Sequence, residues 1–417
     1  MFDKWDRVWR IQTRMASAAQ EIVLLSIRGK DGPGITAALT GVLAKAEGIR
    51  ILDIEQTVVH KKLILSILVQ FPKGNGGQAP LLKELLFTAK KLGVELNFEV
   101  FDPSLLGEEE GDHQYAITCL GNEIGAGALS TIAKALADRK VNIDRISKLT
   151  LKNISALELL THARTQLDPK KLSQELLSLS TKIGIDIAIQ KHDFLRRAKR
   201  LVVMDVDSTL IQNEVIDELA KEAGVAHKVA AITERAMNGH MPFAKALKER
   251  VACLKGVEIK VLERVYKRLK LTAGAERLIR VLKRLGFKIG LVSGGFTYFT
   301  SRIQEKLDLD YAFANQLEIK NNKLTGRVVG PIIDAERKAL ILTTIAQGEK
   351  ISLDQVIAIG DGANDIPMLT KAGLGVAFNA KLKVRKKAHF AMSNHNRLDS
   401  VLYLLGISER EIATLDR

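Results

Sequence analysis

The chain has 417 residues and a formal net charge of +15, with 46% hydrophobic and 27% charged residues. This composition excludes a disordered or collagen-like protein, and the presence of only two cysteines, Cys119 and Cys253, excludes a disulfide scaffold. No apolar run approaches the roughly 20 residues that a membrane helix needs, and the first residues carry charges where a signal peptide is apolar. We therefore expect a cytoplasmic protein built from several domains.

The positive charge is concentrated in the second half of the chain. Residues 1–190 contain 24 Lys and Arg against 22 Asp and Glu, whereas residues 191–417 contain 39 against 26. Such a basic half favours an anionic substrate or nucleic acid. The basic clusters at 196–200 and 381–387 are short and have no aromatic residues between the charges, which is typical of a solvated face. We expect neither a nucleic-acid partner nor a membrane partner.

Residues 1–20 are expected to form an N-terminal extension that carries both tryptophans, Trp5 and Trp9. A first domain is then expected over residues 21–102. Its apolar runs predict the order βαββαβ, with a helix beginning at Pro33, because proline is favoured at a first helical position. The expected strands are 22–27, 49–60, 63–71 and 94–101, and the second helix is 79–92.

A polar and acidic stretch, DPSLLGEEEGDH at residues 102–113, is typical of a linker. The order βαββαβ then repeats over residues 113–191, with strands expected at 115–120, 141–150, 155–163 and 185–189. Two units of similar length and order indicate a duplication.

The βαββαβ order, with GKDGPGIT after the first strand, resembles the ACT domain. The resemblance implies small ferredoxin-like regulatory modules, which often bind amino acids and pair between subunits. In the first unit, Gly32 and Gly34 would leave backbone N–H groups free to face a carboxylate at a helix start. The second unit has GNEIGAG instead and departs from the pattern. We expect a homodimer, with either an amino acid at the first loop or a purely structural role.

From residue 199 to 417, strands and helices alternate, which predicts a parallel α/β sheet. Polar side chains follow three apolar strands, at 201–204, 287–292 and 356–359, and one lysine lies at the start of an amphipathic helix. These side chains belong to Asp205, Asp207, Ser293, Lys338, Asp361, Asn364 and Asp365, with the backbone of Gly294 beside them. Taken singly, each has an ordinary explanation, such as a capped loop, a βα turn or a surface lysine.

Strand ends of an open parallel sheet gather at one edge, so these groups are expected to converge. Carboxylates crowded at one strand end are costly unless a cation or hydrogen bonds compensate. A small hydroxyl followed by free N–H groups favours an anion site. Together they predict phosphoryl transfer assisted by Mg²⁺.

DVDST, SGG, the lysine and GDGAND occur in the order found in the haloacid dehalogenase superfamily. The segments DVDSTLIQNEVIDELAKEAG and AMNGHMPFAKALKERVACLKG are similar to the phosphoserine phosphatase family within it. The resemblance implies a Rossmannoid sheet with a helical cap, and it assigns the roles. By this resemblance, Asp205 would be the nucleophile and Asp207 the proton donor. Mg²⁺ would be held by Asp205, Asp207 and Asp361, with Asp365 behind them. The phosphate would be held by Ser293, Gly294, Lys338 and Asn364.

Residues 212–272 are mostly helical and interrupt the alternation, as expected of a lid that excludes water. The resemblance implies that Glu214 holds the substrate amino group and Arg250 its carboxylate, for which a guanidinium fork is suited. It also implies that Met237 and Phe243 form an apolar wall. Taken singly, a glutamate at a helix start serves the helix dipole, and Met or Phe is usually core.

The expected function is hydrolysis of O-phospho-L-serine to L-serine and phosphate, the last step of serine biosynthesis. Serine bound at the ACT units would give feedback inhibition. One alternative is the same chemistry on another small phosphomonoester, or phosphoryl transfer to an alcohol such as homoserine. Another is an amino-acid-sensing protein with a degenerate catalytic domain, against which the intact acidic motifs speak.

Overall fold

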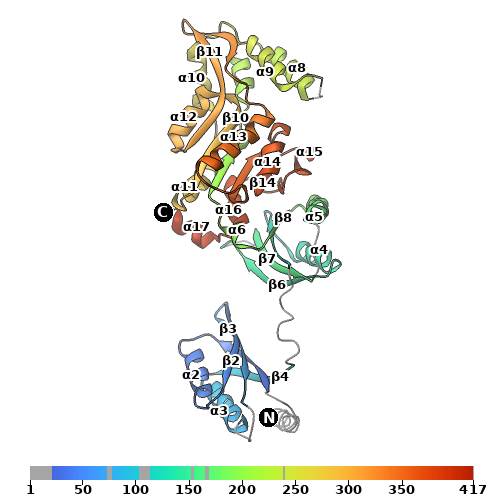
Figure 1. Cartoon of the computed structure of the whole chain (residues 1–417), viewed down its shortest axis with the longest axis vertical. Helices are drawn as coiled ribbons and strands as arrows, with labels where there is room; N and C mark the ends of the chain where they lie inside the picture. The colour runs from blue at the N-terminus through green and yellow to red at the C-terminus, as the bar shows by residue number, and fades with distance from the viewer. Residues whose placement is uncertain are drawn as a thin grey trace. The chain divides into compact units, whose positions relative to one another are not determined.

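A computed structural model describes residues 21–72, 78–102, 113–151, 155–164, 169–237 and 240–416 (Figure 1). The expected N-terminal extension and most of the expected linker lie outside these residues. The chain divides into two compact units, residues 1–110 and 111–417. Within the described residues, no helix is long and apolar enough to span a bilayer.

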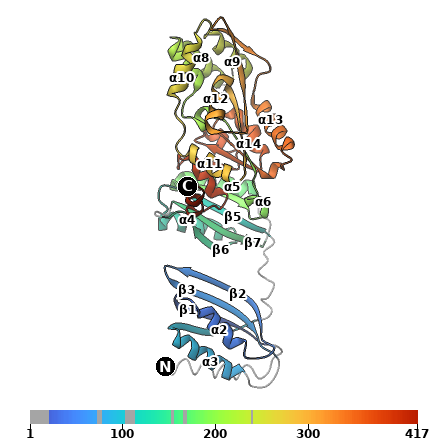
Figure 2. The same ribbon diagram turned by 90° about the vertical axis from the view of Figure 1, so that its left-hand side faces the viewer.

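Unit 1 is an antiparallel sheet of order β2-β3-β1-β4 with two helices on one face (Figure 2). Its elements are β1 (Ile22–Lys30), α2 (Ile35–Leu43), β2 (Arg50–Val59), β3 (Lys62–Gln70), α3 (Gln78–Lys91) and β4 (Val94–Phe101). Alternate residues of the central strands, such as Leu25 and Ile67, pack against Leu39 and Leu85 of the helices. This confirms the βαββαβ order.

One helix start in unit 1 differs from the expectation. The first helix begins at Ile35 and not at Pro33, because Gly34 takes a left-handed φ of 90° and forms the N-cap. Only glycine adopts this conformation at little cost.

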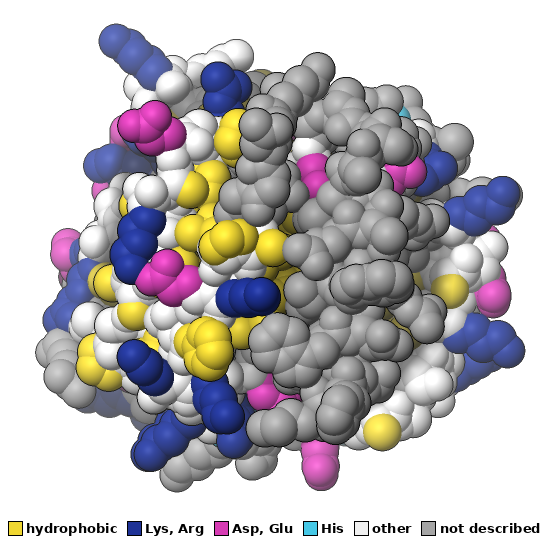
Figure 3. Space-filling model, turned by 90° about the horizontal axis from the view of Figure 1, so that it is seen from below, with side chains coloured by type: hydrophobic (Ala, Val, Ile, Leu, Met, Phe, Trp, Pro, Cys, Tyr) yellow, Lys and Arg dark blue, Asp and Glu magenta, His cyan; other side chains and the backbone are white. Residues whose placement is uncertain are grey.

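Seen from below, the surface carries hydrophobic side chains beside Lys and Arg side chains (Figure 3). Among the exposed hydrophobic residues of unit 1 is Phe87 of α3, whose side chain is 62% exposed.

Unit 2 begins with the second βαββαβ repeat, whose antiparallel sheet has the order β6-β7-β5-β8. Its elements are β5 (His113–Leu120), α4 (Ala126–Ala137), β6 (Val141–Lys148), β7 (Ala156–Ala163), α5 (Pro169–Ile183) and β8 (Asp186–Lys191). One face of the sheet packs on these helices. On the other face, Leu120, Ala156 and Ala188 share a core with the C-terminal segment that contains Leu402 and Leu404. The repeat is thus bound to the rest of unit 2 through its sheet.

A seven-stranded sheet of order β12-β11-β10-β9-β13-β14-β15 forms the centre of unit 2. All neighbouring pairs are parallel except β11 and β12. Its elements follow the short helix α6 (Phe194–Arg197) and are β9 (Leu201–Met204), α11 (Ala275–Arg284), β10 (Lys288–Phe296), α12 (Thr297–Leu307), β11 (Tyr311–Lys320), β12 (Lys323–Val329), α13 (Ala335–Gly348), β13 (Val356–Gly360), α14 (Ile366–Lys371), β14 (Leu374–Phe378), α15 (Leu382–Arg385), β15 (Phe390–Met392), α16 (Val401–Leu404) and α17 (Glu409–Leu415). This is the expected parallel α/β fold.

The helical cap is inserted between β9 and α11. It consists of α7 (Val215–Glu222), α8 (Ala226–Met237), α9 (Phe243–Ala252) and α10 (Ile259–Arg268). The chain enters and leaves side by side, since Ile211 and Leu271 form a β-bridge. The turn between α9 and α10 also pairs with the β11–β12 hairpin, where Gly256 N donates to Leu324 O at 2.8 Å. The cap is therefore attached to the sheet at two places.

Candidate active site

Asp205 follows directly after β9, at the carboxyl edge of the sheet. Its N–H donates to Ile359 O of β13 at 2.9 Å, so the ladder positions its backbone. Three residues later the chain turns sharply at Ser208, which has a left-handed φ of 55°. This conformation is strained for a residue other than glycine, and such strain is concentrated at functional sites. The turn leaves Asp205 and Asp207 both facing the edge where ligands bind in such sheets.

Asp205 and Lys338 form a buried ion pair. The Nζ atom of Lys338 lies 2.9 Å from Asp205 Oδ1 and 2.7 Å from Asp365 Oδ1, and the lysine is fully buried. Burial works against the charge of Lys338, but the two carboxylates raise its pKa above the ordinary value. Burial and the charge of Asp365 raise the pKa of Asp205 well above its usual range, although Lys338 opposes them. The lysine is therefore a fixed cation beside a carboxylate.

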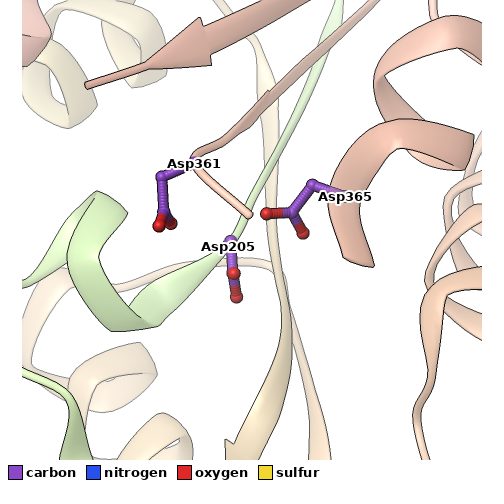
Figure 4. Close-up of side chains that lie close together, drawn as sticks. All are labelled: Asp205, Asp361 and Asp365. Atoms are coloured by element: carbon purple, nitrogen blue, oxygen red, sulfur yellow. The ribbon is translucent and has the colours of Figure 1, made fainter. Parts of the chain in front are cut away.

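Three aspartates surround one space at this edge. Ligand oxygens of Asp205, Asp361 and Asp365 lie within 4.8 Å of one another (Figure 4). Burial and the charge of Asp365 raise the pKa of Asp361 to about 6. A donor set made of carboxylate oxygens suits Mg²⁺. The crowding thus favours a bound divalent cation, which would relieve the repulsion among these groups.

Asp207 faces a different part of the site. Its Oδ1 accepts from Val215 N at 2.9 Å, and its Oδ2 accepts from the Ser293 hydroxyl at 3.2 Å. Burial raises the pKa of Asp207, whereas the hydrogen bond from Val215 lowers it. A carboxyl group that holds its proton more firmly than usual is suited to act as a general acid.

The loop after Val292 bulges out of the sheet. Val292 pairs with Phe313 and Phe296 with Asn315, so three residues of β10 stand opposite one residue of β11. Residues 293–295 thus leave the regular ladder, which is the arrangement expected of a loop that binds an anion. The loop also closes on Asp207: a Cβ added at Gly295 would lie 2.6 Å from Asp207 Oδ2.

Family models match three parts of the chain. Residues 199–373 match haloacid dehalogenase-like hydrolases, and residues 21–99 and 113–190 each match an ACT domain. A phosphoserine phosphatase of Streptomyces coelicolor is 43% identical over 94% of both chains. The phosphoserine phosphatase SerB2 of Mycobacterium tuberculosis is 40% identical over 95% of this chain and 96% of its own.

The chain belongs to the phosphoserine phosphatase family. The solved structure of a haloacid dehalogenase family hydrolase, t0658 of Salmonella enterica serovar Typhi, agrees with this. It is 33% identical, with a TM-score of 0.61, over 70% of this chain and 98% of its own. The fold and the family resemblance expected from the motifs are confirmed.

The cap brings three of its four expected residues toward the sheet edge, namely Glu214, Phe243 and Arg250, whose positive charge opposes the rise in the pKa of Asp207 that burial causes. Glu214 Oε1 accepts from the Ser208 hydroxyl at 2.8 Å. Burial and the neighbouring Asp207 raise the pKa of Glu214 to about 7, against the hydrogen bond from Ser208. A Cβ added at Gly294 would lie 3.0 Å from Cζ of Phe243, so this ring lies directly over the bulged loop.

Arg250 lies at the cap interior, with Nη1 3.5 Å from the Thr233 hydroxyl. Its buried Nε has no hydrogen-bond partner among the described residues, as expected of a group reserved for a ligand. Met237, at the end of α8, is 62% exposed, so the structure does not enclose it in an apolar wall. Asn364 is half-buried on the turn after β13, and Gly32 and Gly34 lie in unit 1 at the start of α2.

Residues that the motifs did not single out also shape the site. Thr209, fully buried, donates its hydroxyl to Asp361 Oδ1 at 2.8 Å. Thr272 donates to Thr209 O at 2.7 Å and so ties the end of the cap to the catalytic turn. Ser208 holds Glu214, as described above. Thr209 and Ser208 lie inside the DVDST motif, which was the available signal for them.

Proposed function

We propose that this protein hydrolyses O-phospho-L-serine to L-serine and phosphate, as the last step of serine biosynthesis. The observation that carries the proposal is one site in which a buried carboxylate–lysine pair and the bulged loop at 293–295 face a cap bearing Glu214 and Arg250. The carboxylate–lysine pair and the loop suit a phosphoryl centre, and Glu214 and Arg250 suit the ammonium and carboxylate of an amino acid. The full-length relatives named phosphoserine phosphatase support the same substrate.

Asp205 attacks phosphorus and carries the phosphoryl group as an aspartyl-phosphate. Covalent catalysis of this kind divides one difficult displacement into two easier ones. Lys338, held 2.9 Å away, favours the ionised form of Asp205, holds the carboxylate in place and meets the phosphoryl oxygens as charge develops. The Ser293 hydroxyl and the N–H of Gly294 bind the remaining oxygens from the bulged loop, with Asn364 beside them.

Asp207 donates its proton to the departing seryl oxygen. The raised pKa of Asp207 favours the protonated form that this step requires. In the second step the same carboxylate takes a proton from the water that attacks the aspartyl-phosphate. The Val215 N–H fixes one oxygen of Asp207 and leaves the other directed at the bulged loop.

The residues at the sheet edge fit a magnesium ion. Lys338 supplies a single positive charge against the carboxylates of Asp205, Asp361 and Asp365, and further positive charge is needed to balance them. The Asp205 and Asp361 carboxylates and the Asp207 backbone carbonyl would hold the ion, with Asp365 behind them. When bound, Mg²⁺ would neutralise charge on the phosphoryl oxygens and the carboxylates.

The cap supplies selectivity. Glu214 pairs with the ammonium of the substrate, and the Arg250 fork pairs with its carboxylate. Phe243 covers the bulged loop and helps to exclude water from the reacting phosphate.

Release of inorganic phosphate from L-phosphoserine, with and without Mg²⁺, tests the proposal. We expect Asp205→Asn to lower kcat by at least about 10⁴-fold, because an amide is not a nucleophile. A panel containing phosphothreonine, phosphohomoserine and p-nitrophenyl phosphate, with homoserine as an added acceptor, tests the alternative substrates and the transfer reaction. Higher kcat/KM on another ester, or full activity of the variant, would contradict the proposal.

The ACT units are proposed to regulate the enzyme. L-serine would bind at the N-terminus of α2, where the Gly34 N-cap leaves backbone N–H groups without a side-chain cap. Titration calorimetry of the full chain with serine, with glycine as the control ligand, measures this binding. The absence of heat, with no effect of serine on kcat or KM, would leave the units a structural role. The homodimer, the cytoplasmic location and the domain bounds 21–102, 113–191 and 199–417 with a cap at 212–272 remain predictions.

A further inference from the structure

Asn315 of β11 lies behind the bulged loop and touches none of the expected catalytic side chains by hydrogen bond. It is 1% exposed. Its Nδ2 donates to Gly294 O at 2.8 Å, and its Oδ1 accepts from Ile333 N at 2.9 Å. One buried amide thus connects the bulged loop to the segment that leads into α13.

The bulge explains why an amide is needed at this position. Because the loop leaves the ladder after Val292, the Gly294 carbonyl loses the strand partner that it would otherwise have. A buried carbonyl without a hydrogen bond is costly, and Asn315 supplies the missing donor. Its two contacts also fix the amide orientation, since a flipped amide would place oxygen against oxygen and N–H against N–H.

The contact sets the geometry of the Ser293 hydroxyl. In a trans peptide, C=O and N–H point in opposite directions, so fixing the Gly294 carbonyl fixes the Gly295 N–H. That N–H donates to Ser293 Oγ at 2.8 Å. With one acceptor site of the oxygen occupied, the Ser293 O–H is directed toward the space beside Asp207, where the phosphoryl oxygens would lie.

The second contact reaches the other phosphate-binding group. Ile333 precedes Asp334, which forms the N-cap of α13 by accepting from Arg337 N. The buried Lys338 lies on the first turns of the same helix. Asn315 therefore holds the start of the Lys338 helix at a fixed distance from the Ser293 loop.

We propose that Asn315 is a positioning residue for phosphoryl transfer, which aligns the Ser293 hydroxyl and the Lys338 helix on the same phosphate. The inference rests on the phosphatase function proposed above. Because Asn315 acts through groups that bind the phosphate more tightly in the transition state, its loss is expected in kcat more than in KM.

Two variants of the full chain test the role. Asn315→Leu is nearly the same size and removes both hydrogen bonds; we expect kcat to fall by about 100-fold and KM to stay within about threefold. The phosphate loop should also bind inorganic phosphate more weakly, measured by product inhibition. Asn315→Asp keeps the shape, but the ionised carboxylate cannot donate to Gly294 O, whereas the protonated form can. The activity of Asn315→Asp relative to wild type should therefore rise by about tenfold from about pH 8 to about pH 5.5.

The control variant is Gln304→Leu, which removes another amide-to-carbonyl contact next to β11, from Gln304 Nε2 to Leu309 O at 3.2 Å. It should retain kcat within about twofold, and thermal unfolding identifies variants that do not fold. A kcat of Asn315→Leu within about twofold of wild type overturns the proposal, and if Asn315→Leu does not fold, Asn315→Ala is measured in its place. All assays are repeated with p-nitrophenyl phosphate. A wild type inactive on phosphoserine would count against the proposed function, while the Asn315 comparison would proceed on the second ester.

Discussion

In the role proposed for Glu214, its pKa would make substrate recognition sensitive to pH near neutrality. Burial raises this pKa to about 7, so the carboxyl is largely protonated below that pH and largely ionised above it. Only the ionised form attracts an ammonium group. The hydrogen bond from Ser208 stabilises the ionised form and limits the shift.

We therefore expect kcat/KM for phosphoserine to rise as pH increases from about 6 to about 8, beyond any rise seen with p-nitrophenyl phosphate. The second ester has no ammonium group and serves as the control for all other titrating groups. Glu214→Gln should remove the difference between the two profiles. Parallel profiles for both substrates in the wild type would contradict the assignment of Glu214.

Thr209 is expected to control metal affinity through Asp361. Its hydroxyl is the hydrogen-bond donor that orients Asp361 Oδ1, and partners behind a metal ligand typically contribute 10- to 100-fold in affinity. Thr209→Val should raise the Mg²⁺ concentration for half-maximal activity by about tenfold, whereas Thr209→Ser, which keeps the hydroxyl, should not. Equal magnesium dependence of the two variants would contradict this role.

At the scale of elements, the convergence of polar side chains at one sheet edge could be predicted from apolar strands that are followed by polar residues, because the carboxyl ends of parallel strands lie at the same edge. Asp205 after β9 and Asp361 after β13 were predicted in this way, and the strands are where the apolar runs place them. The bulge at 293–295 could not be predicted, because it depends on the register of β10 against β11, which the sequence of neither strand contains. For the same reason Asn315 had no visible signal.

The contact between the cap and the β11–β12 hairpin depends on Gly326. This glycine has a φ of 83°, and a Cβ added there would lie 3.0 Å from Lys255 Cβ and 3.3 Å from Ala252 Cα. Alanine would be strained and would also push against the end of α9. The neighbouring Gly330 has a φ of 76° but nothing within 4 Å, so Gly330→Ala isolates the strain alone.

We expect Gly330→Ala to cost about 1 kcal/mol of unfolding free energy and Gly326→Ala about 2 kcal/mol or more. Only Gly326→Ala should also raise KM for phosphoserine, because it displaces a cap attachment. Urea unfolding and steady-state kinetics measure both effects. The same KM in the two variants would show that the hairpin does not hold the cap.

At the scale of the molecule, the second ACT unit is fastened to the catalytic part by polar contacts as well as by its sheet face. Glu158 of β7 pairs with Arg196 of α6, and their side chains are only 13% and 2% exposed. Asp186, fully buried at the start of β8, accepts from Ser393 N and Asn394 N. Strand residues such as Leu120 gave no sign of this docking, since an apolar residue in a strand predicts burial but not against which surface.

Glu158→Gln should lower the free energy of unfolding of residues 111–417 by about 3 kcal/mol, because it leaves the buried guanidinium of Arg196 without its anion. The control is Glu175→Gln, which breaks the pair with Arg139 on the surface of the same unit, where both side chains are about one-third exposed. A surface pair is worth about 1 kcal/mol or less. Urea unfolding of the full chain, with hydrogen exchange in β8 and β15, compares the two. Equal losses would show that the buried pair does not fasten the unit.

The β-bridge between Ile211 and Leu271 closes the base of the inserted cap, so the cap is one continuous segment of the chain. The residues proposed to recognise the substrate, Glu214 and Arg250, lie in the insertion that this bridge closes, whereas Asp205, Lys338 and Asp361 lie outside it. Exchange of residues 212–270 between relatives as one segment should therefore change substrate selectivity, provided that the Val215 N–H contact to Asp207 and the Gly256 contact to Leu324 are kept. A change of substrate in this fold can therefore come from residues of the cap, while the side chains at the sheet edge stay the same.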